Sequence, residues 1–412
     1  MSSSSSLVIR FGIELELLLA STGKKHNSWS SLAGDLSKRL TAAGVPNHVG
    51  DDHTYAEWSI VPEMTVEDNN PYHYGVELVS PIYTASEITT FHNTLITIFD
   101  LLNSSPDNIS LIPTPRTSSH IHLSRDLPLS VDEVARLAKA ALYYESKLDS
   151  LMPVERGSGT TTHWAQSNRE LGVNPVFGGL EMCGALGKID MAVGRGHGRG
   201  LVVVEPRAID LDYGTQRACW ATTPANRKGD VLRLANVVMA MNMVSSDSRV
   251  AIVCHHREEH FVRGKTYKWD FSGLLSVAAA QALASTAEPS SSDSPSESGV
   301  AWREASGPKH VLRDDIDLGI DLLNPGIPNT IEFRQPPGSL SAEDALNWVV
   351  LAVAFFAGAV KPELEDWIGE LGTVLQLGGK DLGWEHLRGL EKLLEVMPPA
   401  GCKCKYCHNS QT

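Results

Sequence analysis

The chain has 412 residues, of which 42% are hydrophobic and 20% are charged, a composition typical of a globular protein and not of a disordered one. Its 35 Lys and Arg residues against 49 Asp and Glu residues give a formal net charge of −14, which argues against a nucleic-acid partner or an anionic membrane surface. We find no apolar run approaching the roughly 18 to 20 residues that span a bilayer and no secretory signal at the start. Three of the six cysteines crowd the last eleven residues, which is not a disulfide framework, so we expect a cytoplasmic protein.

The order of predicted strands, helices and turns indicates one large domain over residues 7–397, with three poorly ordered segments. These are the Ser-rich start at 1–6, an insertion at 285–299 whose only apolar residue type is alanine, and a flexible, Cys-rich tail at 398–412.

Strands and helices alternate between these segments. Apolar alternation predicts strands at residues 7–19, 53–61, 74–80, 117–123, 250–255 and 329–334. Helical periodicity predicts helices at residues 28–43, 84–102, 130–151, 230–245, 270–284, 341–360, 361–376 and 384–396, with capping boxes at Thr84–Glu87 and Ser130–Glu133. Because the strands are separated by long helical stretches, the sheet must be assembled from distant segments, which favours a single α+β domain.

The first strand carries the strongest local signal, Phe11-Gly-Ile-Glu-Leu-Glu-Leu-Leu-Leu19. Alternate side chains of a strand share a face, so Glu14 and Glu16 point to one side while their apolar neighbours point into the core. A solvated acidic face is one interpretation. Metal binding is the other, because two like charges so close repel each other unless a cation lies between them.

Three more strands interrupt an apolar pattern in the same way. Glu77 is alone in Gly75–Pro81, and His120 and His122 share one face of Ser119–Ser124. In Thr330–Gln335, Glu332 and Arg334 lie opposite two apolar side chains. Each segment alone is compatible with a satisfied polar residue at a sheet edge or a core histidine. Four together predict a charged concave wall.

The charges of this wall predict what it binds. Glu14, Glu16, Glu77 and Glu332, together with Glu63, carry five negative charges against the single positive charge of Arg334. Burying such a cluster would drive carboxylates towards protonation unless a pair of divalent cations neutralised it. Carboxylate oxygens with one imidazole suit Mg²⁺, with Mn²⁺ as a substitute, better than zinc. Magnesium beside an arginine indicates a nucleoside triphosphate.

The order FGIELE, WSIVPEMT, GVELVSP, SSHIHLS and IEFRQPPGSL, from about residue 9 to 360, resembles the amidoligase family of carboxylate–amine ligases, related to glutamine synthetase and glutamate–cysteine ligase. The resemblance implies a curved, mainly antiparallel sheet that forms the active-site wall, with helices on its outer face. It also implies one metal held by Glu14, His122 and Glu332, and another held by Glu16, Glu63 and Glu77.

The resemblance extends to the residues around the nucleotide. Arg334 falls at the position that contacts the transferred phosphoryl group, and Glu332 and Glu16 join it as catalytic candidates. Arg156 and His120 are candidate contacts to the bound cofactor. The chain departs from the family where Glu63 replaces an Asp, where Ser118-Ser119 replaces a Cys-Gly-like pair, and where Tyr267–Phe271 replaces an Arg-Tyr-x-x-Leu-Asn-like stretch.

The implied function is an ATP- and Mg²⁺-dependent ligase that joins a small-molecule or peptide carboxylate to an amine through an acyl phosphate. Two alternatives remain open at this point. The first is a degenerate member that binds a nucleotide or a peptide without turnover, and the second is a metal-dependent hydrolase that uses the same carboxylates. The pattern identifies neither the substrates nor the general base, nor the oligomeric state.

Three further motifs are weaker. Gly194–Gly200 matches neither phosphate-binding fingerprint and is either a flexible loop or a lid that supplies Arg195 or Arg199. His255–His260 is not the H-E-x-x-H motif, and a polar strand end is the simpler interpretation. Cys402–His408 holds four potential ligands without a second half-site, so it is interpreted as a loose tail or an adventitious or regulatory metal site.

Overall fold

The computed structural model describes residues 8–21, 26–50, 54–66, 68, 70–104, 109–157, 165–170, 174, 176–195, 228–242, 267–275 and 330–360. The three segments expected to be poorly ordered lie outside these residues, and so do the strand expected at 250–255 and the helices expected at 361–376 and 384–396.

The described strands form one open, nine-stranded sheet whose main path runs β2-β3-β4-β1-β7-β9-β8, with β5 and β6 also pairing with β1. The β2–β3 pair is parallel, and the other described pairs are antiparallel. The expected α+β class with a mainly antiparallel sheet is therefore confirmed. The strands are β1 (Ile9–Ser21), β2 (Asn47–Val49), β3 (Trp58–Pro62), β4 (His73–Val79), β5 (Tyr83–Thr84), β6 (Ile109–Ile112), β7 (Ser119–Arg125), β8 (Trp269–Asp270) and β9 (Ile331–Phe333).

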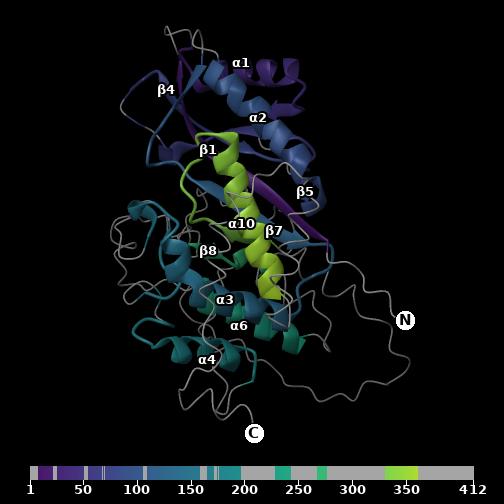
Figure 1. Ribbon diagram of the computed structural model, residues 1–412, viewed down its shortest axis with the longest axis vertical. Coiled ribbons are helices and arrows are strands. Elements are labelled where there is room, and N and C mark those ends of the chain that lie inside the picture. The colour runs from purple at the N-terminus through teal and green to yellow at the C-terminus, as the bar shows by residue number, and fades with distance from the viewer. Residues whose placement is uncertain are drawn as a thin grey trace, which may run out of the picture.

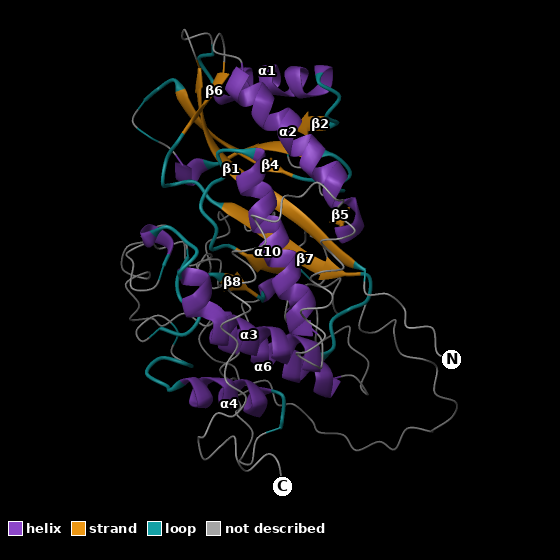
Figure 2. Cartoon of the chain, viewed as in Figure 1, coloured by secondary structure: helices purple, strands orange, loops and turns teal. Residues whose placement is uncertain are grey.

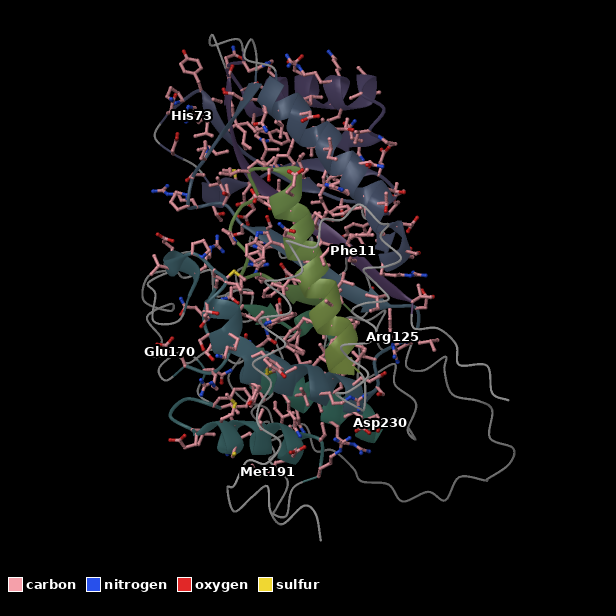
Figure 3. All side chains as sticks on the ribbon, in the orientation of Figure 1. Phe11, His73, Arg125, Glu170, Met191 and Asp230 are labelled. Carbon is pink, nitrogen blue, oxygen red and sulfur yellow. The ribbon has the colours of Figure 1, made fainter. Side chains whose placement is uncertain are left out.

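Strand β1 organises the sheet. It is 13 residues long and pairs with β4, β5, β6 and β7. Its apolar side chains Ile13, Leu15 and Leu17 are at most 1% exposed. Near its start, Phe11, labelled in Figure 3, packs against the rings of Tyr83 and Phe91.

Helices α1 (Trp29–Ala42), α2 (Ile88–Ser104) and α10 (Ala342–Val360) pack against this sheet. Figure 1 shows α10 running along the middle of the molecule across β1 and β7. A second group of helices, α3 (Val131–Asp149), α4 (Met182–Ala192) and α6 (Lys228–Asn242), packs together beyond the β8 side of the sheet (Figure 2).

The predicted capping box at Ser130 is present. The Glu133 amide donates to Ser130 Oγ at 3.3 Å, and the Glu133 carboxylate accepts from the Ser130 amide at 2.7 Å. The same carboxylate binds both terminal nitrogens of Arg125, at 2.6 and 2.9 Å. Arg125 ends β7 (Figure 3), so one glutamate fixes the start of α3 to the end of that strand.

Helix α10 corrects the expectation that no segment is long and apolar enough to cross a membrane. It has 19 residues, and its most apolar stretch has a mean hydropathy of 1.5. However, 72% of that stretch is buried inside the protein. Phe355 of α10 stacks on Trp269 with ring centroids 4.8 Å apart, and Trp269 stacks on Phe333 at 4.3 Å. These contacts identify α10 as a core helix.

The other differences from the predicted elements involve short segments. β2, β5, β6 and α4 were not predicted, and the helix expected at 270–284 begins instead as the end of β8 followed by a 3₁₀ turn, Ser272–Leu275. Strands of two to four residues carry too little alternation to be recognised.

Candidate active site

The sheet register brings the acidic and imidazole side chains of four strands onto one face. Across the β1–β4 pair Glu16 lies opposite Glu77, and across the β1–β7 pair Glu14 lies opposite His120. Directly opposed residues of neighbouring strands point to the same side of a sheet. His122 in turn lies opposite Glu332 of β9, which extends the charged face by one more strand.

The first group of possible metal ligands is Glu14, His122 and Glu332. One ligand atom from each of these residues lies within 4.8 Å of the others. His122 Nε2 is 2.9 Å from Glu14 Oε1 and 3.9 Å from Glu332 Oε1. Glu332 is buried, whereas Glu14 and His122 are about a quarter exposed, so the group opens on one side.

The second group is Glu16, Glu63 and Glu77, again with one carboxylate oxygen from each within 4.8 Å of the others. Glu63 follows β3 and reaches the group because its backbone amide donates to Gly75 O at 3.1 Å. A side chain at Gly75 would prevent this approach, since its Cβ would lie 1.9 Å from Glu63 O. The glycine before Glu77 therefore fixes where Glu63 sits.

His120 lies between the two groups and is only 4% exposed. Its Nδ1 is 3.4 Å from Glu14 Oε2 and 3.6 Å from Glu332 Oε1, and its Nε2 is 3.5 Å from Glu16 Oε1. Glu14, Glu77 and His120 form a third possible ligand group with the same 4.8 Å spacing. The imidazole thus contacts carboxylates that belong to both of the other groups.

Two buried arginines accompany the glutamates. Arg334, which is 8% exposed, forms an ion pair with Glu332 through Nη1, and its Nε has no hydrogen-bond partner among the described residues. Arg156, which is 3% exposed, donates from Nη2 to Thr117 O at 2.8 Å and to Ser118 Oγ at 2.6 Å. Its Nη1 also lacks a hydrogen-bond partner within the part of the chain that the structure describes. Each guanidinium therefore keeps a buried N–H available for an anion.

The electrostatics of the site favour the ionised forms of Glu14 and Glu332. Burial alone would raise the pKa of Glu14, but His122 and hydrogen bonds from both histidines hold the pKa well below its ordinary value. Burial likewise opposes ionisation of Glu332, and the charge of Arg334 lowers its pKa in spite of this. Burial lowers the pKa of Arg156, although the negative charge of Glu16 acts to raise it.

These donors suit a hard divalent cation. Each of the first two groups offers carboxylate oxygens, and only the first adds an imidazole nitrogen, which matches Mg²⁺ or Mn²⁺ better than zinc. Every residue assigned to a metal from the sequence falls into one of these two groups. The structure thus brings the six side chains together, from β1, β4, β7, β9 and the segment after β3.

Sequence reasoning missed several buried polar residues beside this face. Asp270 lies opposite Glu332 across the β8–β9 pair and is 3% exposed, and together with Glu332, the larger cause, it raises the pKa of Arg334 against the effect of burial. Lys268, Asp149 and Gln335 lie next to the two arginines. The charged residues within the apolar stretch Tyr267–Phe271 were the available signal.

Of the weaker motifs, only the start of the Gly/Arg-rich loop is described. Arg195 forms an ion pair with Asp132 in the first turn of α3, and both side chains are exposed. This contact points Arg195 at α3 and gives no support to its role as a lid residue. Arg199, His255–His260 and Cys402–His408 lie outside the described residues.

Comparison with known proteins adds one finding. A family model described as "Putative amidoligase enzyme" matches residues 7–170. No curated protein and no solved structure matches the chain. The matched segment contains the ligand candidates of β1, β4 and β7 and Glu63, whereas Glu332 and Arg334 lie beyond it. Over residues 7–170 the chain therefore matches the amidoligase family, which confirms the resemblance for the four motifs in that segment and leaves the motif with Glu332 and Arg334 outside it.

Proposed function

We propose that this protein is an ATP- and Mg²⁺-dependent carboxylate–amine ligase with a glutamine-synthetase-like catalytic fold. The observation that carries the proposal is the convergence of two carboxylate groups on one sheet face, flanked by buried arginines with available N–H groups. The family match supports a ligase that acts on a carboxylate and an amine. Glutamates that can hold a cation and arginines that can bind phosphate oxygens lie side by side, as a metal-bound triphosphate requires.

The chemistry follows from the poor reactivity of a carboxylate, whose leaving group would be oxide. In the proposed reaction a carboxylate oxygen of the acid attacks the γ-phosphorus of ATP, ADP leaves, and an acyl phosphate forms. The amine nitrogen then attacks the acyl carbon, phosphate leaves, and the amine gives up a proton as the amide forms. Alignment of the reactants and neutralisation of charge are the main tasks of the protein.

The residues divide these tasks. Glu14, His122 and Glu332 would hold one Mg²⁺, and Glu16, Glu63 and Glu77 the other, because these are the sets whose ligand atoms converge. Bound magnesium supplies charge neutralisation and Lewis-acid polarisation of the phosphoryl oxygens. Arg334 and Arg156 would bind phosphate oxygens through their available N–H groups. His120, between the two sets, would stabilise negative charge on the transferred group.

The test is ADP release that depends on both an acid and an amine, screened over pooled metabolites. Glu16→Ala and Glu332→Ala each remove a carboxylate from one ligand set, and we expect each to lower the rate by at least about 100-fold. Glu57→Ala is the matched control, because Glu57 pairs with His48 and belongs to none of the ligand groups.

The same assay separates the alternatives. Turnover of a substrate without nucleotide would favour a metal-dependent hydrolase, and nucleotide binding without ADP release across the whole panel would favour a binding module. Full turnover in both Glu16→Ala and Glu332→Ala would falsify the assignment of the site.

A further inference from the structure

A buried polar cluster lies beside the two arginines and has no role in the reaction as described so far. It consists of Asp149, Lys268 and Gln335, and we call it the hub. Lys268 is 1% exposed and Gln335 is fully buried, while the side chain of Asp149 is 8% exposed. The three residues come from the end of α3, the position directly before β8 and the segment after β9, which are far apart in the sequence.

Asp149 is the centre of the hub. Its Oδ1 accepts from Lys268 Nζ at 2.5 Å and from Gln335 Nε2 at 2.6 Å. Outside the hub, Lys268 Nζ is also 3.6 Å from Glu145, whose carboxylate accepts from the Asn168 amide at 3.1 Å. The ammonium and the carboxylate are thus paired away from water, where a charge left alone would be costly.

The hub holds the backbone of both arginines. Gln335 Nε2 donates a second hydrogen bond, to Arg156 O at 3.1 Å. The Arg334 amide donates to Lys268 O at 2.9 Å, and Arg334 directly precedes Gln335 in the chain. One carboxylate therefore connects the two segments from which the guanidinium groups extend.

The composition of the hub favours a positioning role over a purely stabilising one. Buried ion pairs commonly add little stability compared with apolar residues of the same size, but they fix one arrangement of the groups they join. Gln335 Oε1 is buried, and no described residue donates a hydrogen bond to it, which is a further cost in stability. The two bonds from Gln335 Nε2 bridge Asp149 and Arg156, so geometry is what this side chain provides.

We propose that the hub positions Arg156 and Arg334 on the β- and γ-phosphates of the nucleotide, an inference that rests on the proposed function. Asp149, Lys268 and Gln335 are positioning residues, because they act through the arginines and touch no reacting atom. Small errors in the placement of such groups lower their contribution strongly.

Gln335→Met is the informative variant. Methionine fills nearly the same volume, removes both donated bonds and removes the unpaired oxygen, so we expect the thermal unfolding midpoint to change little. Calorimetric titration in the presence of Mn²⁺ should show binding of a non-hydrolysable ATP analogue and of inorganic triphosphate weakened by about tenfold. AMP, which lacks the β- and γ-phosphates, and Mn²⁺ itself should bind as they do to the wild-type protein.

Glu145→Gln is the matched control. Glu145 is buried in the same polar network, but it bonds to neither arginine segment. This variant should bind the ATP analogue and triphosphate with unchanged affinity. A loss of AMP and Mn²⁺ binding in Gln335→Met that parallels its loss of triphosphate binding would indicate general loosening and overturn the positioning role.

The two proposals fail in different ways. If the wild-type protein binds the ATP analogue and Gln335→Met binds it equally well, the hub inference is wrong and the ligase proposal is untouched. If triphosphate binds and weakens in Gln335→Met while the ATP analogue does not bind the wild-type protein, the hub inference holds and the use of ATP is wrong. Binding of neither probe to the wild-type protein would overturn both.

Discussion

Glu145 shows at the scale of one residue how burial and charge compete in this core. Desolvation raises the pKa of its carboxyl group above the ordinary value of 4.5, against the attraction of Lys268 and a hydrogen bond from Ser167. The folded state therefore disfavours the ionised form. Above the raised pKa the folded protein bears this cost, and below about pH 4.5 the cost disappears because the group is protonated in both states.

Glu145→Gln removes the ionisable group and should therefore raise the thermal unfolding midpoint near pH 8. The gain should shrink as the pH is lowered towards 4.5, because the wild-type carboxyl then takes up its proton in the folded state. Thermal unfolding of both proteins at several pH values measures this difference. An advantage for the variant that grew towards acid pH would contradict the assigned direction of the shift.

The two ligand groups are separable by single substitutions. Glu14→Gln alters the group with His122 and Glu332, while Glu63→Gln alters the group with Glu16 and Glu77. Each variant should weaken Mn²⁺ at one site by at least about tenfold and leave the other site, since ligand charge sets affinity for hard cations. Electron paramagnetic resonance titration of free Mn²⁺ distinguishes this from a single shared site, for which either substitution would abolish all binding.

At the scale of the element, Gly75 determines how β4 meets the segment after β3. Besides its close approach to Glu63, its carbonyl accepts from Trp29 Nε1 of α1 at 3.1 Å. One strand position thus joins a helix, a loop and the second ligand group. A larger residue there would disturb all three.

Gly75→Ala should lower the free energy of unfolding by about 1 to 3 kcal/mol and also weaken the Glu16–Glu63–Glu77 group for Mn²⁺. Gly34→Ala is the control, because Gly34 lies inside α1 and a Cβ there meets nothing within 4 Å. That substitution should stabilise by about 0.5 to 1 kcal/mol. Urea unfolding measures both, and a neutral Gly75→Ala would contradict the required close approach.

At the scale of the whole molecule, the aromatic stack of Phe333, Trp269 and Phe355 connects the β8–β9 side of the sheet to α10. Tyr144 of α3 meets Phe355 edge to face at 6.2 Å, which joins the second helical group to the same stack. The aromatic stack therefore connects the sheet and α10 with the helical group of α3, α4 and α6. Arg334 follows Phe333 directly, so the stack also supports one edge of the candidate active site.

Phe355→Ala should cost about 3 to 5 kcal/mol in the free energy of unfolding, because it opens a cavity in the middle of this stack. Val350→Ala on the same helix should cost less, since Val350 is only partly buried. Equilibrium urea unfolding compares the two. Equal costs would show that Phe355 has no special place in the core.

The sequence predicts which face of a strand a side chain occupies better than it predicts which strands pair with each other. Alternation alone predicted that Glu14 and Glu16 share a face and that Ile13, Leu15 and Leu17 are core residues, because side-chain direction in a strand has a period of two. The repeated pattern of four strands predicted that Glu77, His122 and Glu332 would line the same wall, and the motif resemblance divided the ligands into two groups. No local pattern states which strands pair across long separations.

The hub was not predictable for the same reason. The burial of Lys268 depends on Asp149, which lies 119 residues earlier in the chain. Lys268 and Asp270 alternate with aromatic residues in Tyr267–Phe271, which is the pattern of an exposed strand end until their partners are known. Short strands such as β2 and β8 were missed because two or three residues show no period.

The pairing of β7 with β9 has a consequence for synthesis of the chain. His122 emerges from the ribosome about 200 residues ahead of Glu332, its neighbour in the finished sheet. Until then the edge of β7 that pairs with β9 has no strand partner among the described residues, and such an open edge favours aggregation with other chains. Residues 7–170, the segment that the amidoligase family model matches, therefore lack Glu332, and the first ligand group is complete only after β9 has been synthesised.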